Sequence, residues 1–120
     1  MFVNFSNHKS ALWSEKQRLA AEAYGEIVDV PFPMVSSVAT EDEIDALADQ
    51  CVEEIVSKNP DAAMCQGEFT LTYAVINKLL AKGIKCVSAC SDRVVVERQM
   101  SDGTTQKQSV FEFVQFRQYR

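Results

Sequence analysis

Short apolar runs alternate with longer amphipathic segments along most of this chain, and this alternation restricts the fold more than any other feature. The clearest helical segment follows Thr40, where apolar residues recur at intervals of three and four from Ile44 to Val56. Apolar runs separated by helical segments are typical of parallel strands joined by crossovers. We therefore expect an α/β fold of order β-α-β-α-β-α-β, with a parallel four-stranded sheet and helices on both faces. The expected strands are residues 2–5, 26–30, 62–66 and 85–90, and the expected helices are residues 14–24, 40–56 and 71–82.

Two of the expected helices begin with a capping box, in which a hydroxyl side chain and a Glu or Gln three residues later bond to each other's backbone. Ser14 with Gln17 forms one such pair, and Thr40 with Glu43 the other. The helix after Thr40 carries acidic residues on its outer face. That face is either solvated or a docking surface for a basic partner, and the sequence leaves both readings open.

The last part of the chain predicts a β-hairpin. Val94–Gln99 and Ser109–Phe116 are rich in β-branched and aromatic residues, and Asp102-Gly103 marks a turn between them. Residues 91–93 are expected to form a loop between the fourth strand and this hairpin. The final strand is more apolar than a free edge should be, so we expect the protein's own helices or a second copy to cover it.

Length and composition limit the possible classes of protein. With 120 residues and 47% hydrophobic content, residues 1–120 are expected to form a single domain with one core. No apolar run approaches the ~18 residues that span a bilayer, and the N-terminus lacks a leader pattern, so we expect a cytoplasmic protein with no membrane partner. The net charge of −5 argues against a protein that binds duplex nucleic acid.

Several familiar sites are absent from the sequence. The four cysteines form no C-x-x-C pair, so we expect buried thiols and no metal site. The chain also lacks the G-x-G-x-x-G and G-x-x-x-x-G-K-[ST] loops of dinucleotide and NTP sites, and we expect no cofactor.

Polar residues follow three of the expected strands, at the edge where open α/β sheets bind ligands. They are Ser6, Asn7, His8 and Lys9 after the first strand, Gln66, Gly67, Glu68, Phe69 and Thr70 after the third, and Ser91, Asp92 and Arg93 after the fourth.

These residue types suit a phosphate-bearing ligand. Gly67 would allow close approach of the backbone, and Thr70 opens a helix whose free N–H groups favour anions. Arg93 offers a bidentate phosphate fork, while Asn7 and Gln66 could read a base or ribose edge. The plainer alternative is that Gly67 and Thr70 only cap a helix.

Three further side chains have open roles. His8 lies in a loop, where it could transfer protons or be an ordinary surface histidine. Glu68 could accept a ribose hydroxyl, act as a base, or pair with Arg93 or Lys9. Trp13 fits packing better than base stacking.

A family resemblance rests on several motifs taken together: Asn4-Phe5-Ser6-Asn7-His8, Trp13-Ser14-x-x-Gln17, Gln66-Gly67-Glu68-Phe69-Thr70, Ala89-Cys90-Ser91-x-Arg93 and Phe111-x-Phe113-Val114-x-Phe116-Arg117-x-Tyr119. The chain resembles a small CRISPR-associated family and is similar to the Rossmann-like CARF proteins and ring nucleases. The resemblance implies a Rossmann-like three-layer sandwich and a homodimer that holds a cyclic oligoadenylate across its two-fold axis, in type III CRISPR antiviral defence.

The preferred hypothesis is therefore binding of a cyclic oligoadenylate, with metal-independent cleavage to a 2′,3′-cyclic phosphate. His8, Arg93 and Glu68 are the catalytic candidates. The ligand-binding candidates are Ser6, Asn7, Gln66, Gly67, Phe69, Thr70 and Ser91. The alternatives are a non-enzymatic sensor or adaptor with the same pocket, and a structural subunit with no ligand.

Overall fold

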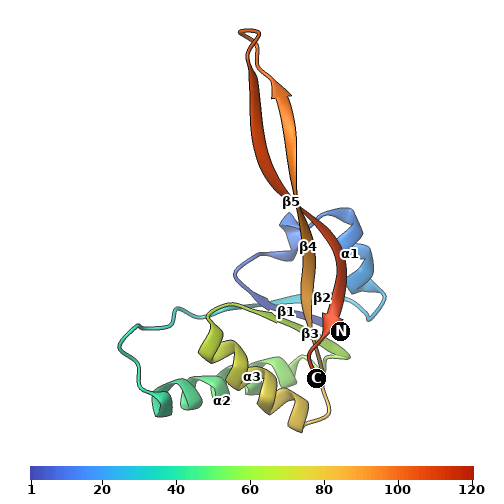
Figure 1. Ribbon diagram of the computed structural model, residues 1–120. Helices are drawn as coiled ribbons and strands as arrows, with labels where there is room; N and C mark the ends of the chain where they lie inside the picture. The colour runs from blue at the N-terminus through green and yellow to red at the C-terminus, as the bar shows by residue number, and fades with distance from the viewer.

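The computed structural model describes residues 1–120 and shows an α/β fold in which four parallel strands alternate with helices (Figure 1). No helix combines the length and the apolar character needed to cross a membrane. The parallel strands are β1 (Phe2–Ser6), β2 (Ile27–Pro31), β3 (Ala62–Gln66) and β4 (Lys85–Gln99). The other elements are the 3-10 turn η1 (Ser10–Leu12), the helices α1 (Glu15–Glu22), α2 (Glu41–Ser57) and α3 (Phe69–Ala81), and the strand β5 (Thr105–Gln118).

The sheet differs from the expected one in its fifth strand. Its order is β2-β1-β3-β4-β5, and β5 runs antiparallel to β4, so the sheet is mixed and five-stranded rather than purely parallel and four-stranded. The expected loop at residues 91–93 does not form. These residues continue β4 past a register shift at Cys90/Ser91, because β5 offers them pairing partners and no Gly or Pro interrupts the run. The hairpin is therefore a direct extension of the sheet edge.

Side-chain caps explain where the helices start. The capping box predicted at Thr40 is complete, since Thr40 accepts from the Glu43 N–H and the Glu43 carboxylate accepts from the Thr40 N–H. Only half of the capping box predicted at Ser14 forms: the Ser14 hydroxyl accepts from the Gln17 N–H, but the Gln17 side chain lies at Met64 and does not bond back to the Ser14 N–H. Helix α3 begins two residues before the predicted start, because the Glu68 carboxylate caps it.

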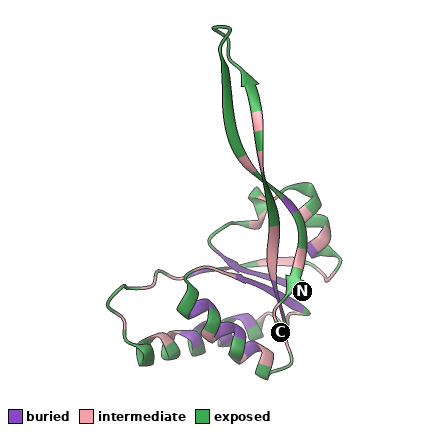
Figure 2. Cartoon of the chain, viewed as in Figure 1, coloured by how far each residue is buried: buried purple, intermediate pink, exposed green.

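Helices cover both faces of the sheet. Alternate residues of β1 point to opposite sides, so that Val3 and Phe5 join the core beneath α2 and α3, while Phe2 packs with Ala21 of α1. The buried residues in Figure 2 accordingly lie along the short strands and the inner sides of the helices. Three of the four cysteines, Cys51, Cys65 and Cys86, are free thiols buried in the larger core, as expected, whereas Cys90 on β4 is a free thiol that is only partly buried.

Part of the acidic outer face of α2 is used inside the molecule. The Lys78 ammonium on α3 lies 2.9 Å from a carboxylate oxygen of Asp45 and 2.9 Å from one of Asp49. Hydrogen bonds to Asp49 and Asp45 raise the pKa of Lys78. The two carboxylates therefore help to join α2 to α3.

Candidate functional site

A cleft of about 600 Å³ opens at the carboxyl ends of the central strands, on the face of the sheet that α1 covers. The chain leaves β1 toward β2 on one side and β3 toward β4 on the other, so the cleft lies at the switch point of the sheet, where α/β proteins bind ligands. Ser6 and Gln66, the last residues of β1 and β3, are register partners and both line it. The other lining residues are His8, Leu12, Trp13, Ser14, Gln17, Met64, Ala89, Ser91, Phe111 and Phe113.

A buried polar network holds the loop that carries His8. The Asn4 amide nitrogen donates to the His8 carbonyl at 2.7 Å and to an Asp29 carboxylate oxygen at 2.9 Å. The Asn4 amide oxygen accepts from the Ser6 hydroxyl at 2.6 Å, and the Ser6 oxygen accepts from the His8 N–H at 3.2 Å. The backbone at His8 is thus held by β1 and β2, while its ring stays exposed at the cleft.

Gln66 joins β3 to β4 beyond the end of their backbone ladder. That ladder ends at the pair Met64 and Val87, and the Gln66 side-chain oxygen then accepts the Ala89 N–H at 2.7 Å. The Gln66 amide nitrogen donates no hydrogen bond within the chain and is available to a ligand. The amide of Gln17 also lines the cleft, and its only contact within hydrogen-bond distance is a weak one from its nitrogen to the Met64 sulfur at 3.9 Å.

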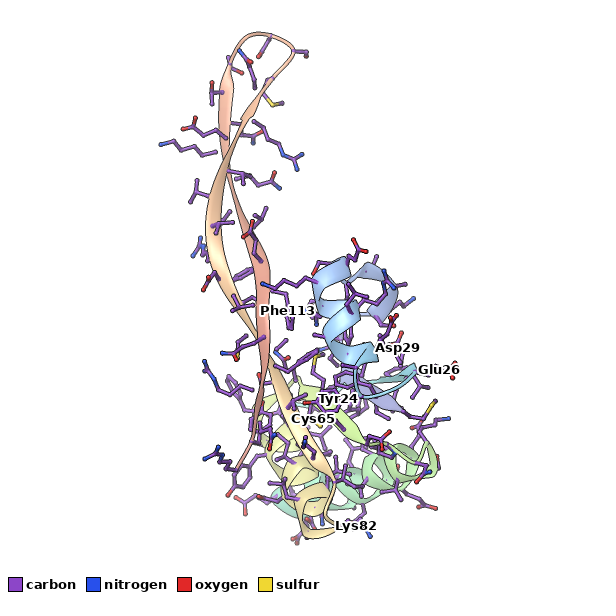
Figure 3. All side chains as sticks on the ribbon, turned by 90° about the vertical axis from the view of Figure 1, so that its right-hand side faces the viewer. Tyr24, Glu26, Asp29, Cys65, Lys82 and Phe113 are labelled. Atoms are coloured by element: carbon purple, nitrogen blue, oxygen red, sulfur yellow. The ribbon has the colours of Figure 1, made fainter.

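An aromatic cluster forms the inner wall of the cleft. Trp13 packs edge-on against Phe2 and beside Phe116, with ring centroids 6.2 and 6.4 Å apart. Phe113 is buried against Phe116, and Figure 3 shows it at the base of the hairpin on the side of α1. Trp13 therefore packs into the core, as its sequence context favoured, and also presents part of its side chain to the cleft.

The mouth of the cleft is apolar and open. Leu12 is 81% exposed and Phe111 is 75% exposed, although both line the cleft. Exposed apolar side chains beside polar groups are typical of a surface that receives a ligand.

Arg93 and Ser91 lie on β4, not in the loop predicted for them. Ser91 pairs with Phe113 and Arg93 with Phe111, so that both face the cleft side of the strand pair. Ser91 lines the cleft, while Arg93 lies two residues further along β4 on the same side, at the rim of the cleft. The Arg93 guanidinium donates to the Ser109 hydroxyl at 3.3 Å.

Glu68 occupies the helix N-terminus that was expected to receive a phosphate. Its carboxylate accepts from the N–H groups of Thr70 and Leu71, at 3.0 and 2.8 Å, and from the Thr70 hydroxyl. These hydrogen bonds lower the pKa of Glu68, and the bond from the Leu71 N–H has the largest effect. An anion bound there would have to displace a carboxylate of the chain itself.

Gly67 makes room for an aromatic ring of the protein. A Cβ at this position would lie 2.4 Å from a ring carbon of Phe32, which packs on Phe5. The close approach that the glycine allows is therefore to Phe32.

The structure divides the predicted site residues between two faces of the sheet. Ser6, His8, Gln66 and Ser91 meet in the cleft. Asn7 is exposed on the loop beside them and does not line it. Phe69 and Thr70, with Glu68, belong instead to the start of α3 on the opposite face.

The exposed side of α3 has a groove of its own, of about 710 Å³, next to the C-terminal residues. Phe69 and Tyr73 are largely exposed there, and the buried Thr72 hydroxyl has no hydrogen-bond partner. This groove carries fewer polar groups than the cleft and lies away from the switch point.

Sequence reasoning missed residues that support or line the cleft. Asn4 and Asp29 position the His8 loop, and Leu12 and Gln17 line the cavity. One signal could have found Asn4, since an amide in the middle of the apolar run 2–5 must have a partner when it is buried.

Comparison with known proteins returns one family. The model of the Uncharacterized protein MJ1673 family matches residues 1–117. Neither a curated protein nor a solved structure matches the chain.

Proposed function

The chain belongs to the MJ1673 family, and from its structure we propose that it binds a nucleotide ligand of the cyclic oligoadenylate class in the switch-point cleft. One observation carries the proposal: the cleft of about 600 Å³ lies between the ends of β1 and β3 and combines aromatic, amide and hydroxyl side chains. Its volume is in the range of small-ligand sites. This is a Rossmann-like use of an α/β sheet.

The polar groups of the cleft suit an adenine base. Gln66 offers an amide N–H donor, because its oxygen is already bonded to Ala89, and Gln17 offers an amide oxygen acceptor. Adenine presents a ring nitrogen acceptor beside an amino donor, which such a donor and acceptor complement. Phe111 and Trp13 provide aromatic surface against which a base can stack.

No lysine or arginine lines the cleft, so base contacts carry more of the recognition than phosphate contacts. Arg93 at the rim is the side chain placed to meet a phosphate, and it would exchange its bond to Ser109 for a charge-assisted one. Glu68 and Thr70 take no part, since they lie at α3. We extend the proposal to a homodimer in which each copy brings one cleft.

Cleavage is the second candidate function, and the placement of His8 favours it. In a metal-independent reaction the ribose 2′-oxygen attacks its own phosphorus, the bond to the 5′-oxygen breaks, and a 2′,3′-cyclic phosphate forms. One proton leaves the 2′-hydroxyl and another reaches the departing 5′-oxygen. His8, exposed at the cleft on a backbone held by Asn4, can serve as the proton-transfer group.

Labelled cyclic tri-, tetra- and hexa-adenylate test both functions. Incubation with the purified protein, with and without EDTA, should retain at least one ring in a filter-binding or gel-shift assay. Linear products that persist in EDTA would show cleavage, and retention without products would show a sensor or adaptor. If no ring binds at tens of micromolar protein, the proposal of a nucleotide ligand is wrong. The remaining alternative is then a structural subunit with no ligand.

A matched pair of variants locates the binding. Gln17→Ala removes an amide that lines the cleft, and we expect weaker retention of the ring. Asn77→Ala removes an amide from the α3 groove and should leave retention unchanged. Equal loss in both variants would place the ligand elsewhere.

A further inference from the structure

The outer part of the hairpin, residues 92–112, projects from the body as a two-stranded ribbon, which we call the arm (Figures 1 and 2). It gives the molecule a longest dimension of 55 Å and a radius of gyration of 16.9 Å. A compact chain of this length has a radius of gyration of about 14 Å. Because two-stranded ribbons are marginally stable alone in water, an arm of this length needs a surface to pack against.

The two sides of the arm differ. Cross-strand partners lie on the same side of the ribbon, and so do alternate residues along each strand. The register of β4 and β5 therefore shows on which side each residue lies. Arg93, Val95 and Phe111 lie on the side that continues into the cleft. The opposite side, which we call the valine face, consists of Asp92, Val94, Val96 and Arg98 on β4 and Gln106, Gln108, Val110 and Glu112 on β5.

Charge is distributed unevenly along the valine face. At its base Asp92 pairs directly with Glu112, an arrangement of like charges that destabilises a strand pair. At its outer end Arg98 pairs with the neutral Gln106 and forms no ion pair with an acidic side chain of the chain. Asp92 and Arg98 are six positions apart on β4, which is roughly 20 Å of strand, and the valines of this face lie between them.

We propose that a second copy of the chain covers this surface, with the two valine faces packed antiparallel about a two-fold axis. The axis passes at the level of Val95, so β4 lies over β4. Asp92 then faces the partner's Arg98, and Val94 faces the partner's Val96. The symmetry repeats each contact, as an isologous interface requires.

Charge selects this orientation over the alternative. A parallel two-fold arrangement would place Asp92 and Glu112 over the same acidic pair of the second copy, which like-charge repulsion opposes. The antiparallel arrangement brings an arginine to each acidic pair and buries the valines that separate them. The partner's turn would lie next to Cys90 and Gln115, whose side chains are partly or fully exposed.

The proposal does not rest on the ligand. The valine face and the cleft lie on opposite sides of the strand pair, so this dimer would leave both clefts open and separate. Each copy would then bind its ligand in its own cleft, and no ring would be held across the two-fold axis. Failure of the arm interface and failure of nucleotide binding can therefore be told apart on the same protein.

Sedimentation of the full chain from about 1 to 100 μM tests the interface. We expect a dimer for the natural sequence and, for Arg98→Glu, a dissociation constant at least ten-fold higher. Combining Arg98→Glu with Asp92→Lys and Glu112→Lys restores opposite charges and should restore the dimer. Circular dichroism checks that each variant is folded.

The matched control reverses charges on the other side of the arm. Glu97 and Lys107 are cross-strand partners there. The double variant Glu97→Lys with Lys107→Glu keeps opposite charges in this pair but exchanges the strands that carry them. This variant should dimerise like the natural chain. A natural chain that is monomeric at 100 μM, or an Arg98→Glu protein that dimerises normally, would overturn the proposal.

Discussion

At residue 67 the space for a side chain is already occupied. The ring of Phe32 lies where a Cβ would be, so Gly67→Ala must displace it. We expect the free energy of unfolding to fall by about 1–3 kcal/mol, the usual cost of overpacking. Urea denaturation measures it. In a Phe32→Leu background the same substitution should cost clearly less, and additive losses would show that Phe32 is not the obstacle.

Two other residues separate binding from chemistry. Arg93→Ala removes a charge-assisted phosphate contact, so ring affinity should fall by about ten-fold or more. His8→Ala should keep the affinity and, if rings are cleaved, slow cleavage by about 100-fold. Arg117→Ala is the matched arginine control, because its partner Ser88 lies on the far side of β4. Wild-type cleavage by His8→Ala would remove His8 from the mechanism.

At the scale of a helix, the start of α3 depends on an ionised carboxylate. Hydrogen bonds to the helix lower the pKa of Glu68, so its cap stabilises the fold fully above the unfolded-state pKa, near 4.3. That stability is lost as the pH falls through the lower folded-state pKa. Glu68→Gln should therefore be less stable than the natural chain at pH 7, and the difference should shrink below about pH 4.

Thermal unfolding of both proteins from pH 3 to pH 7 makes this comparison. Asp102 in the hairpin turn also has a lowered pKa, because Thr104 donates to it, and it adds acid sensitivity of its own. Asp102→Asn therefore serves as the control for a carboxylate outside α3. A constant difference between Glu68→Gln and the natural chain at every pH would exclude the ionised cap.

At the scale of the whole molecule, the arm is separable from the body. Replacing residues 95–109 by Asn-Gly would join Val94 to Val110 through a two-residue hairpin turn. Within one chain, residues 95–99 pair with residues 105–109 and with no other strand, so the body should keep its stability within about 0.5 kcal/mol when both proteins are monomeric. Denaturant unfolding at a concentration at which the natural chain is monomeric measures this, and sedimentation of the shortened chain should show a monomer at every concentration. A shortened chain that fails to fold would show that the arm supports the core.

The sequence by itself determined the features that act over a few residues. Capping at Thr40, the apolar period from Ile44 to Val56 and the apolar runs of the four parallel strands are local, so the order of elements up to β4 was predicted correctly. The hairpin turn at Asp102-Gly103 is local too, since Gly103 supplies the positive φ that it needs. Glu68 was missed as a cap because glutamate is an uncommon residue there.

Only the tertiary structure decided how distant segments combine. Nothing near Ser91–Arg93 reveals that β5 will pair with them, so a predicted loop became strand and an arm appeared. The face of the sheet on which a residue lies also depends on packing. Gln66 lines the cleft on one face, while α3, which starts at Phe69, packs on the other face. Local preferences set where a segment begins and ends, whereas strand pairing and burial depend on residues far away in the chain, and these assembled the cleft.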